Sequence, residues 1–262
     1  MSQYQENATV TRVEQFSDKN FRVTLHSPQI SAAARPGQFA MVRAGMGKDP
    51  LLRRPFSIHQ TASDGSLQFY FKVVGRGTDI LARKRVGEEV PVFGPLGCGF
   101  TIKEDGAAII VGGGLGIAPL LFLVKEKCRL KKSCSSDILI LGGRGEVEIA
   151  PLLDDFKQFG ITILTSTDDG SLGMHGNVTD VLQSLDLAPG CNVYACGPEP
   201  MMAGVSKFCK AKTFACQVSV ESVMACGMGA CLGCSRPAKN GTYTHVCLHG
   251  PVYDAEKLVW NI

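Results

Sequence analysis

Several features of membrane and secreted proteins are missing from this 262-residue chain. No apolar run reaches the roughly 18 residues that a membrane-spanning helix needs, because glycine, proline or lysine interrupts the longest ones. The N-terminal residues, from Met1 to Asn7, are polar and do not resemble a secretory signal. No block of lysine and arginine marks a nucleic-acid surface, and the net charge of +3 is small. We therefore expect a cytoplasmic protein that binds no nucleic acid and has no membrane span.

The composition is that of a globular protein, with 45% apolar and 19% charged residues. The length allows two modest domains and a small appendage. Eleven cysteines without a secretory signal indicate a reducing compartment. Seven of them are scattered along the chain, and we interpret most of these as small buried side chains with no redox role: Cys98, Cys128, Cys134, Cys191, Cys196, Cys209 and Cys216.

The other four cysteines form a motif near the C-terminus. Cys226, Cys231, Cys234 and Cys247 follow the spacing C-x4-C-x2-C-x12-C, which is typical of a plant-type [2Fe-2S] cluster. Three of the thiolates come from one tight loop, whose glycines allow the backbone to take a positive φ and to approach the inorganic sulfides. Amide N–H groups aimed at the sulfurs would offset their negative charge. We predict that these four cysteines bind the cluster.

Other interpretations of the four cysteines are weaker. Zinc knuckles favour two balanced short pairs of cysteines, whereas here one loop supplies three thiols. A redox disulfide between Cys231 and Cys234 would be expected at a helix start after a strand. His245 and His249 flank Cys247, but their alternation with apolar residues indicates one face of a strand, so we leave them out of the site.

The first hundred residues read as short strands. Apolar and polar residues alternate over 8–16 and 21–27, with a polar turn between them, and further strands are expected at 37–43, 56–60 and 67–74. Strands at this spacing predict a small antiparallel β-barrel.

Two places in this region break the strand pattern and suggest a ligand. Arg54, fixed by the following proline, could contact a phosphate, and Ser57, further along the same strand face, could reach a heterocycle. Gly77 and Thr78 lie in a glycine turn that is expected to open a short helix at 79–85. The start of such a helix is a ready anion site.

The middle of the chain predicts a doubly wound parallel sheet. The apolar run 106–111 leads into Gly112-Gly113-Gly114-Leu115-Gly116 and then into a helix over 118–132, which is the geometry that places a diphosphate on a helix start. Strands at 137–141, 161–165 and 191–195 alternate with helices at 150–159 and 178–185. The last strand ends in Cys196-Gly197-Pro198, at the sheet edge where ligands bind.

The choice between NAD and NADP is argued from charge. A 2′-phosphate favours a basic residue at the ribose, and a free 2′-hydroxyl favours a carboxylate. The loop after 161–165 carries Asp168 and Asp169 and no basic residue, although Arg144 stands on the preceding loop. We predict NAD.

These motifs occur in an order that resembles the ferredoxin–NADP reductase superfamily. Arg54-Pro55-Phe56-Ser57 looks like the flavin motif of that superfamily, in which the arginine holds the FAD diphosphate and the serine approaches the flavin. The resemblance implies further FAD contacts from Phe71-Lys72-Val73 and Gly77-Thr78. It also implies that two motifs frame the nicotinamide nucleotide, with the predicted contacts Gly113, Gly114, Gly116, Cys196, Gly197 and Pro198. Phe56 stands where an aromatic hydroxyl is common, which removes one flavin hydrogen bond.

From residue 8 to the end, the chain resembles the electron-transfer subunits of class B, NAD-dependent dihydroorotate dehydrogenases. The closing block from Glu221 to Cys234 carries this resemblance. It implies an FMN-containing catalytic partner that oxidises dihydroorotate in pyrimidine biosynthesis, and a heterotetramer of two copies of each subunit. Flavin converts a two-electron hydride into single electrons, so the implied path runs from the partner's FMN through the cluster and FAD to NAD.

The implied domains are an FAD-binding barrel at 1–102, an NAD-binding α/β domain at 103–217 and a cluster domain at 218–262. Relatives with the same layout serve other partners, as in NADH-dependent ferredoxin:NADP oxidoreductase and sulfhydrogenases, some of which replace one cluster ligand. A different class would be a non-catalytic zinc-bearing module that senses NAD(H), which would be colourless and free of iron.

Overall fold

The computed structural model describes residues 2–45, 47 and 49–260, which form two compact units. The first unit combines Met1–Gly99 with Glu221–Arg236 and Thr244–Pro251. The second combines Phe100–Val220 with Pro237–Tyr243 and Val252–Ile262. The C-terminal segment therefore contributes to both packing units. The three predicted domains, with boundaries at 102 and 217, stay a prediction.

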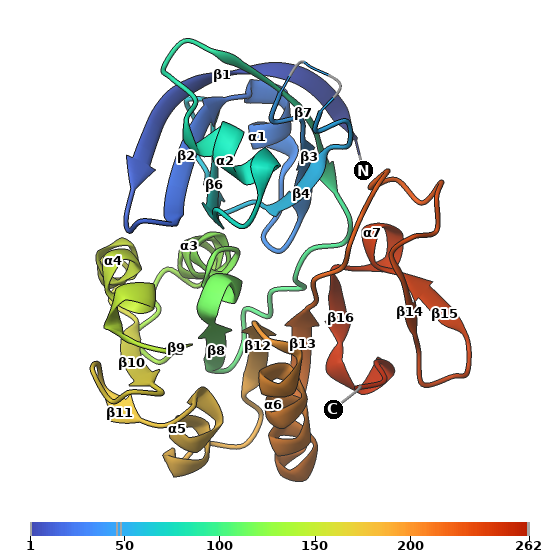
Figure 1. Cartoon of the computed structure of the whole chain (residues 1–262). Helices are drawn as coiled ribbons and strands as arrows, with labels where there is room; N and C mark the ends of the chain where they lie inside the picture. The colour runs from blue at the N-terminus through green and yellow to red at the C-terminus, as the bar shows by residue number, and fades with distance from the viewer. Residues whose placement is uncertain (1, 46, 48, 261–262) are drawn as a thin grey trace. The chain divides into compact units, whose positions relative to one another are not determined.

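An antiparallel sheet forms the frame of the first unit (Figure 1). Its seven described strands follow the order β4-β3-β7-β1-β2-β6-β5. Val23 and Leu25 on β2 and Leu67 and Phe69 on β6 are fully buried, so the alternating positions expected from the sequence do line the core. The strands are β1 (Tyr4–Gln15), β2 (Asn20–His26), β3 (Phe39–Val42), β4 (Arg54–Ser57), β5 (Gln60–Thr61), β6 (Ser66–Lys72) and β7 (Glu89–Leu96).

Short helices complete this unit: α1 (Pro28–Ala33), α2 (Arg76–Ala82) and α7 (Val246–His249). Two expectations were wrong here. The helix predicted at 79–85 begins at Arg76. Gly75 before it is extended, and the Gly75 amide donates to the Thr78 hydroxyl at 3.2 Å, which starts the helix here. Residues 245–249 are not one strand: β15 ends at His245 and α7 follows at once, which makes the two histidines neighbours one helical turn apart.

The second unit is built on a sheet of described strands in the order β11-β10-β9-β8-β12-β13-β16, parallel except for β16. The order reverses direction beside β8, so right-handed crossovers place α3 and α4 on one face and α5 and α6 on the other (Figure 1). The strands are β8 (Ala108–Gly113), β9 (Ile138–Gly143), β10 (Thr162–Thr167), β11 (Met174–His175), β12 (Asn192–Cys196), β13 (Ala215–Ser219) and β16 (Val252–Asp254). The helices are η1 (Gly114–Ile117), α3 (Leu120–Lys131), α4 (Glu146–Lys157), α5 (Val178–Ser184), α6 (Glu199–Lys212) and η2 (Ala255–Lys257).

The predicted antiparallel barrel and doubly wound parallel sheet are both confirmed. A hairpin of β14 (Ser235–Pro237) and β15 (Tyr243–His245) follows the cysteine loop. Within the described residues, none of the helices has the length and apolar character needed to cross a membrane.

The seven scattered cysteines differ in their surroundings. Cys98 is half-buried, and its thiol donates to the Leu248 carbonyl at 3.4 Å. Cys191, Cys196, Cys209 and Cys216 are buried thiols, as expected. Cys128 and Cys134 instead form a disulfide that closes the turn between α3 and β9. This bond was not predicted from the sequence, and the six-residue separation allows the turn to bring the two Cα atoms to 5.2 Å.

Candidate functional site

The four cysteines of the C-terminal motif gather in the first unit as two pairs. The Sγ atoms of Cys234 and Cys247 lie 3.3 Å apart, although 13 residues separate them in the chain. Cys226 and Cys231 form the other pair, in which the Cys231 amide points at the Cys226 sulfur at 3.4 Å. Cys234 and Cys247 are buried, whereas Cys231 is exposed.

Backbone amides surround these sulfurs. The amides of Met228 and Gly229 donate to Cys226 and Cys247 at 3.5 and 3.1 Å. Gly227 and Gly229 have φ values of 73° and 83°, a backbone conformation that glycine adopts without strain. The loop can therefore turn its N–H groups inward, as a cluster with negative charge requires.

The protein environment shifts the pKa values of Cys226 and Cys247 in opposite directions. Burial would raise the pKa of Cys226, but the amides of Met228 and Cys231 outweigh it and lower this pKa to about 6. Burial, followed by the neighbouring Cys234 thiol, raises the pKa of Cys247 to about 12. Cys226 thus favours its thiolate, whereas the Cys247 thiol holds its proton more tightly.

The arrangement of the four thiols fits a two-iron cluster. Two pairs of thiols bridged by amide donors suit a cluster in which each iron takes two cysteines. His245 and His249 point elsewhere: their rings stack at 5.9 Å, and each Nδ1 meets a hydroxyl, that of Ser235 or Thr244.

The predicted flavin motif lies on β4, at the end of the barrel sheet. The Arg54 side chain lies against the first turn of α2. A Cβ added to Gly77 would be only 3.3 Å from the Arg54 Nε. Glycine at this position therefore lets the guanidinium reach the start of α2, where Thr78 also stands. The structure brings Arg54 to Gly77, next to Thr78, in an arrangement suited to a diphosphate.

The Thr78 hydroxyl is occupied with its own helix. It accepts from the amides of Val74 and Gly75 at 3.0 and 3.2 Å and donates to the Gly75 carbonyl at 2.8 Å. In this position the hydroxyl orders the turn, and the first amides of α2 are the donors left for an anion.

The remaining flavin-motif residues split between the two faces of β4. Strand alternation puts Ser57 with Pro55, opposite Arg54, so the shared face expected from the sequence was wrong. The Phe56 ring is buried between Phe69 and Phe71, with centroid distances of 5.8 and 5.4 Å. Lys72 ends β6, and Val73 follows it in the turn toward α2. Contact of these residues with FAD stays a prediction.

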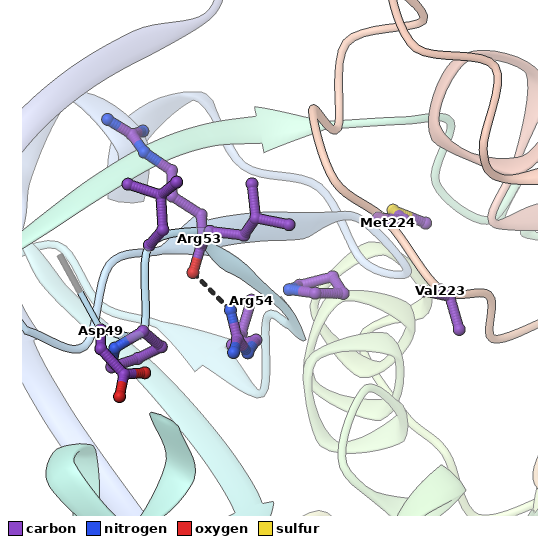
Figure 2. Close-up of a pocket in the computed structure, with 9 residues that line it drawn as sticks. Asp49, Arg53, Arg54, Val223 and Met224 are labelled. Carbon is purple, nitrogen blue, oxygen red and sulfur yellow. Dashed lines mark hydrogen bonds between the residues drawn. The ribbon is translucent and has the colours of Figure 1, made fainter. Parts of the chain in front are cut away.

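A cavity of about 430 Å³ opens beside Arg54 (Figure 2). The chain from Asp49 to Pro55 forms one wall, and Val223 and Met224 form another. Figure 2 shows Arg54 at the wall formed by 49–55, where its Nη1 donates to the Leu52 carbonyl. Met224 lies only two positions before Cys226. The cavity thus lies between the predicted flavin motif and the segment that leads into the cysteine loop.

In the second unit, the two predicted nicotinamide motifs meet. β8 and β12 are neighbours, with Gly112 level with Cys196. A Cβ added to Gly116 would lie less than 3.0 Å from backbone atoms of both Cys196 and Gly197. A Cβ on Gly113 would lie 2.5 Å from Met201 Sδ. Glycine is therefore required at Gly116, where backbone atoms are the obstacle, whereas a side chain at position 113 would displace the Met201 side chain.

The neighbouring loops carry the charged residues used to choose between NAD and NADP. Arg144, which follows β9, makes an ion pair with Glu148 at 2.6 Å. The hydroxyl and amide of Ser171 donate to Asp169 and lower the pKa of its carboxyl. Asp168 lies beside these groups, and its amide donates to the Gly143 carbonyl at 3.1 Å.

Sequence reasoning missed several residues of these sites. Val223 and Met224 carry no motif, and only the fold places them beside Arg54. Nothing in the sequence around Met201 distinguishes this residue from others in a helix. Glu148 left a readable signal, because it stands four residues after Arg144 in the first turn of a helix, which is the spacing of an ion pair.

Comparison with known proteins bears on both units. The family model for the iron–sulfur cluster binding domain of dihydroorotate dehydrogenase B matches residues 221–259. The dihydroorotate dehydrogenase B (NAD(+)) electron transfer subunit of Desulforamulus reducens is 38% identical, over 97% of this chain and 98% of its own. The corresponding subunit of Geobacillus kaustophilus is 35% identical over 97% and 98%. This chain belongs to the family of dihydroorotate dehydrogenase B electron transfer subunits. The family prediction made from the sequence is thereby confirmed.

Solved structures agree with this family. The NADH-dependent reduced ferredoxin-NADP oxidoreductase structure superimposes with a TM-score of 0.87 and 29% identity, covering 97% of this chain and 90% of that one. A ferredoxin NADP+ reductase from Neisseria gonorrhoeae gives 0.67 and 17%, over 79% and 91%. The second likeness shows only that the two chains share a fold. The chain is thus an oxidoreductase subunit of the electron-transfer type.

Proposed function

We propose that this chain carries electrons from the FMN of a dihydroorotate dehydrogenase catalytic subunit, through a [2Fe-2S] cluster and FAD, to NAD in pyrimidine biosynthesis. Family membership and the paired thiols in their ring of amides support this proposal. FAD supplies the conversion between single electrons and a hydride when it is bound. The protein's own task is to hold the three groups and to keep water and stray acceptors away from them.

Each site has its own residues for this task. Cys226, Cys231, Cys234 and Cys247 hold the cluster, and the amides of the glycine loop stabilise its charge. For FAD, Arg54 and the start of α2 bind the diphosphate, while Ser57, together with Pro55, Phe56, Phe71, Lys72 and Val73, shapes the flavin site. For the nucleotide, Gly113, Gly114 and Gly116 face Cys196, Gly197 and Pro198 across β8 and β12.

The partner docks where the cluster loop is accessible. Met228 and Leu232 are each about half-exposed, at 50% and 54%, and they stand among the cysteine ligands. Because both side chains belong to the loop that carries the ligands, this loop is the part of the cluster site that a partner can reach. The assembly that we propose contains two copies of each subunit and is cytoplasmic.

A second candidate is the small subunit of an NADH-dependent reduced ferredoxin-NADP oxidoreductase. The TM-score of 0.87 with that structure favours this second candidate, in which the chain would work with a different partner subunit. The two candidates differ in the chain that accompanies this one. The chemistry within this chain is the same in both.

Anaerobic co-purification of the tagged chain tests the proposal. We expect a flavoprotein with the sequence of a dihydroorotate dehydrogenase, and the complex should reduce NAD with dihydroorotate as the electron donor. Recovery of a ferredoxin-NADP oxidoreductase large subunit would support the second candidate instead. Purified material that lacks iron and acid-labile sulfide would refute both.

A further inference from the structure

The position of Arg144 in the nucleotide unit bears on which dinucleotide the site accepts. β9 lies beside β8, and Gly142 is level with Gly113 of the glycine loop. Arg144 stands two residues beyond that level, at the carboxyl edge of the sheet where a nucleotide binds. An arginine in this place would ordinarily favour a 2′-phosphate, because guanidinium groups bind phosphates through paired hydrogen bonds.

Glu148 occupies this guanidinium. Its Oε1 accepts from Arg144 Nε and Nη2 at 3.0 and 2.6 Å, and its Oε2 accepts from the Arg144 amide at 3.0 Å. The Glu148 side chain is only 22% exposed, whereas that of Arg144 is 74% exposed. Glu148, followed by the charge of Asp168, raises the pKa of Arg144. The arginine therefore faces carboxylates from both α4 and the loop after β10.

The loops that carry these groups are tied together. The Asp169 amide donates to the Arg144 carbonyl at 3.2 Å, and the Glu146 amide donates to the Ser171 hydroxyl at 2.8 Å. The same hydroxyl donates to Asp169 at 2.6 Å. Arg144 is thus held in a network of hydrogen bonds that spans two loops, and its backbone has little freedom to follow a ligand.

We propose that Glu148 is a specificity-determining residue: by engaging Arg144, it makes the site select a dinucleotide with a free 2′-hydroxyl over one with a 2′-phosphate. The inference rests on the proposed function, which places the nucleotide at the ends of β8 and β12. A 2′-phosphate would have to displace the Glu148 carboxylate from Arg144 and remain beside it and Asp168. A 2′-hydroxyl carries no charge and meets neither cost.

The test is the variant Glu148→Gln, whose amide oxygen can still accept from the Arg144 backbone. The binding of NAD⁺ and NADP⁺ to the FAD-loaded chain is measured by calorimetry, so that no electron transfer is needed. We expect the affinity for NADP⁺ to rise about five- to tenfold and that for NAD⁺ to change less than twofold. Adding Arg144→Gln to this variant should abolish the gain.

The matched control is Glu126→Gln, which breaks the similar exposed ion pair with Arg129 on α3. It should leave both affinities unchanged. If Glu148→Gln binds NAD⁺ normally without any gain for NADP⁺, the specificity role is refuted and the proposed function stands. If the unaltered chain binds neither dinucleotide, both are refuted. Should Glu148→Gln fail to fold, Asp168→Asn removes the other facing carboxylate and must give a gain in the same direction.

Discussion

Substituting Gly116 by alanine tests the close approach of the two nucleotide loops. The added Cβ would lie 2.5 Å from the Gly197 Cα, and ordinary contact begins at 3.4 Å, so one backbone must retreat by about 1 Å. Because the obstacles are backbone atoms, no rotamer change can relieve the overlap. Overpacking of this kind costs about 1–3 kcal/mol. For a protein of this size we expect the melting temperature to fall by about 3–10 °C.

The functional effect should be larger than the thermal one. A displacement of about 1 Å at a binding loop can reduce turnover about a hundredfold. Stopped-flow reduction of the bound FAD by NADH measures this, and the visible spectra of the flavin and the cluster report on the other unit, which should be unchanged. Gly45→Ala is the control, because its Cβ would make an ordinary contact, 3.8 Å from Ile80 Cδ1. If Gly116→Ala melts within about 1 °C of the unaltered protein and reacts with NADH normally, the packing argument is wrong.

Three further predictions concern other parts of the chain. Cys231→Ser should abolish electron transfer to the partner while NADH still reduces the FAD; rapid-mixing spectroscopy measures both, and unimpaired transfer would disprove the relay role of the cluster. The hydrogen bond from Arg22 lowers the pKa of Glu14 below 4.5, so folding gains stability above that pH and loses it as the pH falls. Glu14→Gln should therefore cost under about 1 kcal/mol at neutral pH, and thermal melts should show the difference shrinking in acid. Reduction of the Cys128–Cys134 disulfide should lower the free energy of unfolding by about 2 kcal/mol, so dithiothreitol should lower the melting temperature of the unaltered protein. The same reagent should not shift the melting temperature of Cys128→Ser.

The periodic parts of the chain were predictable from the sequence. Alternating strands such as β2 and β6, and buried runs such as β8, carry their own signal because the side-chain period is set by local geometry. The glycine loops at Gly116 and Gly197 were also visible, since only the packing of one backbone on another calls for glycine there. The family prediction rested on the block from Glu221 to Cys234 and on the order of the motifs along the chain.

What the sequence could not show depends on partners distant in the chain. α1 and β7 were not predicted, and neither was β16, which is held by pairing with β13 more than 30 residues earlier. The start of α2 was misplaced because an extended Gly75 and the Thr78 hydroxyl set it, rather than an apolar pattern. His245 and His249 alternate as a strand would, yet the chain turns into α7 between them.

The pairing of β16 with β13 has a consequence for dissecting the chain. Ser219 is level with Val252, so the strand before the cysteine segment and the strand after it run side by side in opposite directions. The intervening thirty or so residues are therefore an insertion between the two arms of a hairpin. Cutting the polypeptide after Val220 would strip an edge from the nucleotide-binding sheet, whereas excising 221–250 and closing the gap with a tight turn would keep it. A diaphorase fragment without the cluster should be sought by internal excision and not by C-terminal truncation.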